Sequence, residues 1–151
     1  PSPMPKEIVE KEAVRALVEA DVLTICSGGG GIPVVAEDGQ YVGVEAVNDK
    51  DFSARVLAEN VDADRLIILT GVDNIYINYN QPDQKALEQI SVAEAEEYIK
   101  EGHFAAGSML PKIEAALDFV KGDDKRKAII TSIENLENID KEAGTVISQK
   151  G

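Results

Sequence analysis

The chain has 151 residues, of which 44% are hydrophobic and 28% are charged, as is ordinary for a globular protein with a buried core. Its 15 basic and 28 acidic residues give a net charge of −13 at pH 7. This charge argues against nucleic acid or an anionic membrane surface as a partner, because both need a basic footprint. We expect a single domain over residues 1–151 and, by default, a cytoplasmic location, since no apolar run reaches the length of a membrane span.

The first 31 residues predict a helix, a buried strand and a glycine loop. Apolar residues at helical spacing predict a helix over about residues 6–20, with Pro5 at its first position. Residues 22–27 are apolar and rich in β-branched side chains, which predicts a buried strand and makes Cys26 an inert core thiol. Four glycines follow, and their backbone N–H groups could approach a phosphate or another small anion. A flexible linker is the alternative.

A hairpin and a second helix come next. Asp38 and Gly39 lie between two short apolar runs, which is typical of a tight β-hairpin. Asp51 is expected to cap a helix that ends near residue 60. Lys50 would add to the positive potential at the start of this helix and attract an anion, whereas Asp51 could orient lysines by ion pairing. A helix cap beside a solvated lysine is the alternative.

Strands and helices alternate through the rest of the chain. The run at residues 65–70 is continuous and apolar, as expected for a strand covered on both faces. This alternation predicts an α/β fold with a largely parallel sheet, flanked by helices, that includes residues 22–27, 66–70 and 128–131. Further strands are expected at residues 75–79 and 144–147.

Two capping signals predict helices in the second half. Ser91 and Glu94 form a capping box for a helix that ends near residue 100. Pro111 lies in the first turn of another helix, with Gly122 as its C-terminal cap. Ser132 can cap a short third helix.

Lys112 and His103 are the remaining candidates for chemistry. Lys112 lies in a first helical turn, where a cation is unfavourable unless an anion is present, so a second anion site is indicated. An ordinary surface lysine is the alternative. His103 is the only histidine, and no spaced cysteines accompany it, so we expect a loop residue rather than a metal ligand.

Several segments, in this order, together resemble carbamate kinase, a member of the amino-acid kinase superfamily. They span residues 27–34, 45–51, 68–73, 102–112, 128–136 and 144–146. The resemblance implies a three-layer αβα fold with a mainly parallel sheet. It also implies that the chain corresponds to the carboxy-terminal, nucleotide-binding half of that family, without its amino-terminal Gly-Gly-Asn loop.

The resemblance implies roles for individual residues. Lys50 would contact the phosphates, Asp51 would hold the catalytic lysines in place, and Lys112 would neutralise the leaving β-phosphate of ADP. Backbone donors would line the carbamate and phosphoryl site at Gly28, Gly29, Gly30 and Gly31. The nucleotide would contact Thr70, Val72, Tyr76 and Met109. Two positions depart from the family pattern: Asn48 stands where an aliphatic residue is usual, and Ala106 where proline is usual.

The implied reaction interconverts ATP plus carbamate with ADP plus carbamoyl phosphate, and it would run toward ATP in arginine breakdown. Mg²⁺ would be carried with the nucleotide, and the full-length enzyme would be a homodimer. A non-catalytic nucleotide-binding module is one alternative. Another kinase of the superfamily is the other, although the Asp49-Lys50-Asp51 triplet argues against it. We expect the four glycines, Lys50 and Lys112 to converge on one anion-binding cleft.

Overall fold

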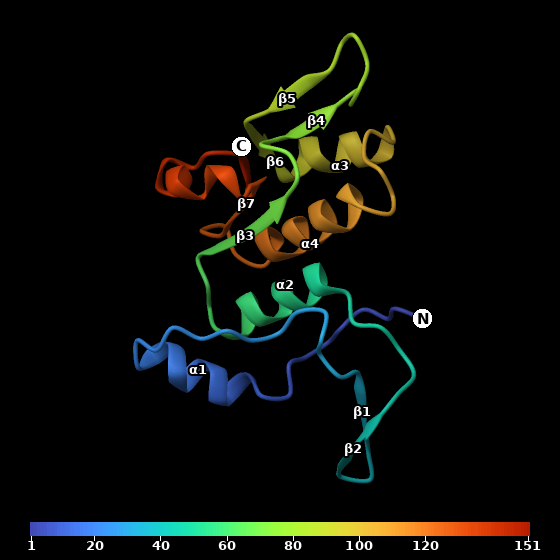
Figure 1. Cartoon of the computed structure of the whole chain (residues 1–151), viewed down its shortest axis with the longest axis vertical. Coiled ribbons are helices and arrows are strands. Elements are labelled where there is room, and N and C mark those ends of the chain that lie inside the picture. The colour runs from blue at the N-terminus through green and yellow to red at the C-terminus, as the bar shows by residue number, and fades with distance from the viewer. The chain divides into compact units, whose positions relative to one another are not determined.

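The computed structural model describes residues 1–151. Contacts divide the chain into two compact units, residues 1–62 and residues 63–151, which are described separately below (Figure 1). A single domain over the whole chain stays a prediction. None of the helices combines the length and apolar character needed to cross a membrane.

The unit of residues 1–62 contains two helices that contact one another, α1 (Lys11–Glu19) and α2 (Lys50–Asn60). The Arg15 guanidinium of α1 donates through Nε to the Asn60 carbonyl at 3.0 Å, which ties α1 to the end of α2. The prediction that α1 begins at Pro5 is wrong. Met4 would have to cap such a start, and its side chain has no oxygen to accept a backbone N–H.

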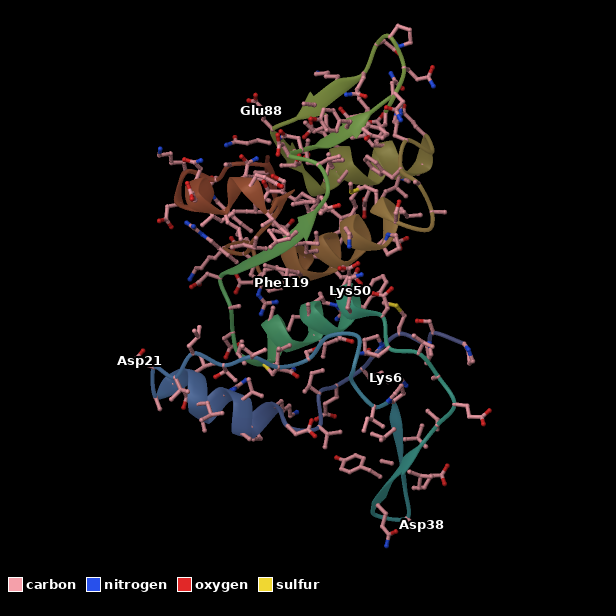
Figure 2. All side chains as sticks on the ribbon, in the orientation of Figure 1. Lys6, Asp21, Asp38, Lys50, Glu88 and Phe119 are labelled. Carbon is pink, nitrogen blue, oxygen red and sulfur yellow. The ribbon has the colours of Figure 1, made fainter.

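The predicted hairpin is present in the same unit. Strand β1 (Val34–Glu37) pairs antiparallel with β2 (Gln40–Gly43), and Glu37 lies opposite Gln40. Asp38 and Gly39 have φ angles of 47° and 78°, so both turn residues adopt the left-handed conformation that a two-residue hairpin requires. Figure 2 shows Asp38 at the tip of this ribbon.

The prediction of a buried strand at residues 22–27 is wrong. The stretch has no strand assignment, and no strand of the chain pairs with it. Leu23 is 96% exposed and Ile25 is 98% exposed, and Cys26 is an exposed thiol rather than a core residue. Apolar composition shows that a segment is suited to burial, but a strand also needs a neighbour to pair with its backbone.

The unit of residues 63–151 contains a four-stranded sheet in the order β3-β7-β8-β6. The strands are β3 (Arg65–Thr70), β6 (Gln89–Ser91), β7 (Lys127–Ser132) and β8 (Thr145–Ser148). The β3/β7 and β6/β8 pairs are parallel, whereas β7/β8 is antiparallel, so the sheet is mixed. The expected combination of a sheet with helices is confirmed, but residues 22–27 are not part of this sheet.

The strand covered on both faces is β7 rather than β3. Every residue of β7 from Ala128 to Ser132 is buried. Strand β3 lies at the edge of the sheet, and its burial alternates: Leu66 and Ile68 are buried, while Ile67 and Leu69 are more than a third exposed. The strand predicted at residues 65–70 is therefore confirmed, but the prediction that both of its faces are buried is wrong.

Two helices pack on this sheet and on each other, α3 (Val92–Lys100) and α4 (Met109–Lys121) (Figure 1). The capping box at α3 is confirmed, and hydrogen bonds from the Ser91 backbone and side chain lower the pKa of Glu94. Helix α4 begins two residues before Pro111 and has Gly122 at its C-terminal cap. An ion pair of 2.6 Å between Lys121 and Glu96 joins the two helices.

Three further elements complete this unit. Strands β4 (Ile75–Ile77) and β5 (Lys85–Leu87) form an antiparallel hairpin. A 3₁₀ helix, η1 (Glu134–Lys141), lies against β7, and the Ser132 hydroxyl accepts the Asn135 N–H at 3.3 Å near its start. The three-residue strands β5 and β6 were not predicted, because the run from Lys85 to Ser91 has no strong apolar alternation.

Gly144 tests the packing of β7 against β8. Its φ is +124°, and a Cβ there would lie 2.6 Å from the Thr131 Cβ and 2.7 Å from the Ile130 carbonyl oxygen. We expect Gly144→Ala to lower the free energy of unfolding by about 1–3 kcal/mol, because strand backbone must move and the conformation is strained. Urea denaturation measures this loss. The control is Gly107→Ala, where no atom lies within 4 Å of the added Cβ; equal effects would contradict the explanation.

Candidate functional site

The glycine loop presents open backbone on one side. Ser27 and Gly28 have φ angles of 66° and 102°, and the Gly31 N–H donates to the Gly28 carbonyl at 3.2 Å, which closes a turn. No atom lies within 4 Å of the place where a Cβ would stand on Gly28, Gly29 or Gly30. A ligand could therefore approach the backbone of these three residues closely.

Asn48 joins this loop to helix α2. Its Nδ2 donates to the Gly28 carbonyl at 2.8 Å, and its Oδ1 accepts a hydrogen bond from the Ser53 hydroxyl. Ser53 is 1% exposed and lies in α2. A Cβ on Gly31 would lie 2.8 Å from the same Asn48 nitrogen, so a larger residue there would displace this amide. The loop is held to the helix that carries Lys50 by a single side chain.

The cap of α2 is Asp49, so the prediction that Asp51 caps this helix is wrong. Asp49 Oδ1 accepts the backbone N–H of Asp51 at 2.9 Å and that of Phe52 at 3.3 Å. The helix begins at Lys50, and Asp49 is therefore the residue in position to cap it. Because Asp49 already occupies these N–H groups, the positive group that α2 offers to an anion is the Lys50 ammonium.

Lys50 and Asp51 form an ion pair, with Nζ 3.7 Å from Oδ2. The Lys50 side chain is 65% exposed and that of Asp51 is 10% exposed. Figure 2 shows Lys50 at the start of α2. A nearly buried carboxylate thus lies beside a solvent-facing ammonium, which limits the positions that the lysine can take.

The start of α4 carries the second predicted cation. Ser108 is the cap residue but makes no side-chain hydrogen bond to the helix. The N–H groups of Ser108, Met109 and Leu110 all donate to the Ala105 carbonyl, at 3.1–3.2 Å. Lys112 is half-buried in a first turn that has no acidic residue. The helix dipole there favours a negative group beside the lysine.

The loop after β3 is fixed to the two strands beside it. The Ser132 hydroxyl donates to Asp73 Oδ1 at 2.6 Å, and the Thr131 hydroxyl donates to the Asp73 carbonyl at 3.3 Å. The Ile75 N–H donates to the Thr145 hydroxyl of β8 at 2.8 Å. Val72, within this loop, and Tyr76, just after it, are therefore attached to an anchored segment.

The predicted site residues fall in two groups along the chain. The four glycines, Lys50 and Asp51 belong to residues 1–62. Asn48 links the glycine loop to helix α2, which carries Lys50 and Asp51. Thr70, Val72, Tyr76, Met109 and Lys112 belong to residues 63–151, and all five are half-buried. Convergence of the two groups on one cleft stays a prediction, as do the assigned roles.

The remaining candidate from the sequence is His103, and the structure also shows hydrogen-bonded side chains that the sequence analysis did not single out. His103 lies in a loop, with its Nε2 3.0 Å from Glu101 Oε2 and its ring in a T-shaped arrangement with that of Tyr98. No group of three or more His, Cys, Asp or Glu side chains could hold a metal ion. Two sets of hydrogen bonds, which we call clamps, were not predicted: those of Asn48 with Gly28 and Ser53, and that of Ser132 with Asp73. Each of these clamps lies within or beside a segment that carried the resemblance.

Comparisons with known proteins agree on the family. A sequence model described as the amino acid kinase family matches residues 1–132. Carbamate kinase 1 of Enterococcus faecium is 55% identical over 151 residues, and the carbamate kinase of Latilactobacillus sakei is 54% identical over 150 residues. Each match covers 99% of this chain and 48% of the relative. The chain therefore belongs to the amino acid kinase family.

Within that family the chain is similar to carbamate kinases in structure as well as in sequence. The carbamate kinase from Giardia lamblia, solved bound to AMP-PNP, matches with a TM-score of 0.93 and 43% identity. The match covers 99% of this chain and 53% of the Giardia chain. The expected amino-acid kinase fold is thus confirmed, and the chain spans about half the length of the relatives it matches.

The Asn48 clamp can be tested by Asn48→Val, which introduces the kind of side chain usual in the resembled family. We expect the free energy of unfolding to fall by about 1 kcal/mol, because the Gly28 carbonyl and the Ser53 hydroxyl each lose a partner. Amide exchange at Gly31 should become faster as the loop loosens. Urea denaturation and hydrogen-exchange mass spectrometry measure the two effects. Gln89→Val, at an exposed position in β6, is the matched control; unchanged exchange at Gly31 would contradict the clamp.

Proposed function

We propose that this chain is the nucleotide-binding half of a carbamate kinase. The proposed reaction transfers a phosphoryl group from carbamoyl phosphate to ADP, giving carbamate and ATP. The observation that carries the proposal is the identity of 54–55% to carbamate kinases over 99% of the chain. The residues assigned to the site, including Lys50, Asp51 and Lys112, lie within the matched region.

Phosphoryl transfer requires positioning and positive charge more than covalent help from the protein. The bond between the carbamate oxygen and phosphorus breaks while a bond from an ADP β-phosphate oxygen to phosphorus forms. In the proposal, Lys50 contacts the phosphates and Lys112 neutralises the β-phosphate. The backbone of the glycine loop donates to the carbamate and phosphoryl oxygens. No nucleophilic side chain is needed.

Local geometry supports these roles. The unobstructed backbone of Gly28, Gly29 and Gly30 leaves room for a phosphoryl group. The Lys50–Asp51 distance of 3.7 Å is suited to a carboxylate that orients a lysine. For the nucleotide we propose contacts with Thr70, Val72, Tyr76 and Met109. The first three lie at the end of β3, in the loop that Asp73 anchors, and in β4 just after it. Met109 begins α4, the helix that carries Lys112.

Mg²⁺ is part of the proposal as an ion carried by the nucleotide. The chain has no group of three side chains able to hold a metal, so the phosphates and water would supply most of the ligands. When bound, the ion would reduce the negative charge on the phosphates. We further propose a cytoplasmic homodimer that works in arginine breakdown.

The second candidate function is nucleotide binding without catalysis. It concerns the 151-residue chain by itself, which covers 48% of the E. faecium enzyme. One experiment compares the two functions: calorimetric titration of the 151-residue chain with ADP, together with an assay of ATP formation from carbamoyl phosphate and ADP.

We expect the chain alone to bind ADP weakly and to transfer no phosphate. In-line transfer needs both ends of the reaction held, and loss of one end forfeits several kcal/mol of positioning. A chimera in which this chain is joined to the half of the E. faecium enzyme that it does not match should form ATP. Robust turnover by the 151-residue chain would contradict the expectation, and an inactive but folded chimera would favour the non-catalytic function.

Lys112→Ala in the same chimera tests the assigned charge. We expect kcat to fall by about 10²–10³-fold, with a smaller effect on KM, because charge on the β-phosphate changes in the transition state. Steady-state kinetics in ADP separates the two constants. Lys121→Ala, near the other end of α4, is the control. A raised KM with unchanged kcat would show that Lys112 binds the ground state and the transition state equally, which would contradict the assigned role.

A further inference from the structure

An open cleft lies where strands β3 and β7 begin, in the unit of residues 63–151. Its volume is about 570 Å³, and it is lined by Asp64, Arg65, Lys125 and Lys127. In the register of these parallel strands, Arg65 and Lys127 form the first pair, and Thr70 belongs to the last. The cleft is therefore at the opposite end of the two strands from Thr70, and none of the residues assigned to the nucleotide or the phosphates lines it.

Three of the four lining side chains are cationic, in a chain whose net charge is −13. Lys127 has a partner, since its Nζ lies 2.7 Å from Glu142 Oε1. Arg65 and Lys125 are exposed, and neither forms an ion pair with Asp64 or with any other carboxylate. The cleft therefore contains two cations that have no direct partner within the chain.

The pairing of β3 with β7 places two of the three cations side by side. Arg65 lies opposite Lys127 in the parallel register, so both side chains leave the same face of the sheet from neighbouring strands. Like charges in this arrangement destabilise a sheet, whereas an anion between them would remove the repulsion. Glu142 meets only the Lys127 side of the pair. The register is thus a second observation, besides the cleft itself, that indicates an anionic ligand.

The turn before β7 fixes the backbone that carries the third cation. Asp123 Oδ1 accepts the Lys125 N–H at 2.9 Å, and the Asp123 carbonyl accepts the Arg126 N–H at 3.1 Å. The Arg126 guanidinium is directed elsewhere, 4.9 Å from the centre of the Phe119 ring. Lys125 and Lys127, on either side of Arg126, both line the cleft. Because the backbone is already ordered, less conformational entropy is lost when a ligand binds.

We propose that this cleft binds a phosphate dianion, with Arg65 and Lys125 as its direct charged contacts and Lys127 beside them. A guanidinium donates two parallel N–H groups to two phosphate oxygens, and an ammonium adds a compact positive charge. The volume is within the range of small-molecule sites, so the phosphate can be the free ion or part of a monoester. The inference does not depend on the proposed phosphotransfer, because it concerns the other end of β3 and β7.

Backbone amides can report binding at the cleft directly, by nuclear magnetic resonance of the isotope-labelled 151-residue chain. Inorganic phosphate is titrated at constant ionic strength, with sodium chloride as the balancing salt. We expect saturable shifts at the amides of Arg65, Lys125 and Lys127 with a Kd of about 1–10 mM, and none in chloride alone. Glycerol 3-phosphate is the second probe. Tighter binding of this ester would identify a monoester as the ligand, equal binding would identify the free ion, and both results support the site.

Paired substitutions make the test specific. Arg65→Gln combined with Lys125→Gln should weaken phosphate binding at the cleft by at least about 10-fold, because both unpaired cations are lost. Both side chains are exposed, so circular dichroism of the variant should be unchanged. The matched control, Lys85→Gln combined with Lys100→Gln, removes the same charge from exposed positions in the same unit and should leave binding at the cleft unchanged.

Phosphate also has an expected site at the start of α4, and Lys112→Ala separates the two sites. The shifts at Arg65 and Lys125 should persist in this variant. Three results would overturn the proposal. They are shifts at the cleft that do not saturate, equal weakening in the two double variants, and loss of the cleft shifts in Lys112→Ala.

Discussion

Two buried hydroxyl groups on strand β7 fix much of the order in residues 63–151. Thr131 is 0% exposed and Ser132 is 2% exposed, and a buried hydroxyl without a partner costs about 1–3 kcal/mol. Both hydroxyls donate to Asp73, one to its carbonyl and one to its carboxylate. The loop after β3 therefore cannot leave β7 without stranding two polar groups.

The unit of residues 1–62 uses the same kind of constraint with fewer buried side chains. Ser53 is 1% exposed, and its single hydroxyl proton is shared between Asn48 Oδ1 and the Asp49 carbonyl. The Asn48 amide in turn donates a hydrogen bond to the Gly28 carbonyl. A loop of four glycines has high conformational entropy when free, so a polar clamp is what gives it a defined position. In both units, side-chain hydrogen bonds rather than apolar packing place the proposed functional loops.

The features that the sequence predicted well are those whose energetics are local. The Asp38-Gly39 turn and the Ser91–Glu94 capping box each involve residues that are at most three apart, so the pattern contains the whole interaction. The prediction of a strand at residues 22–27 failed because a strand needs a neighbour for its backbone, and local sequence does not show whether one is present. The clamp between Asp73 and Ser132 was missed for a related reason. It joins residues 59 apart, and no periodicity marks such a pair.

In the run Asn48-Asp49-Lys50-Asp51, residue type alone does not show which partner each side chain takes. All four residues are polar and adjacent, yet Asn48 holds the glycine loop, Asp49 caps α2 and Asp51 pairs with Lys50. Lys50 alone directs most of its side chain to solvent. Since Asp49 accepts the N–H groups of Asp51 and Phe52, these two donors are not open to an anion. Asp49 therefore fixes the start of the helix, Asp51 restrains the Lys50 ammonium and Asn48 holds the neighbouring glycine loop. Four adjacent polar residues thus have four different tasks, and composition alone does not distinguish them.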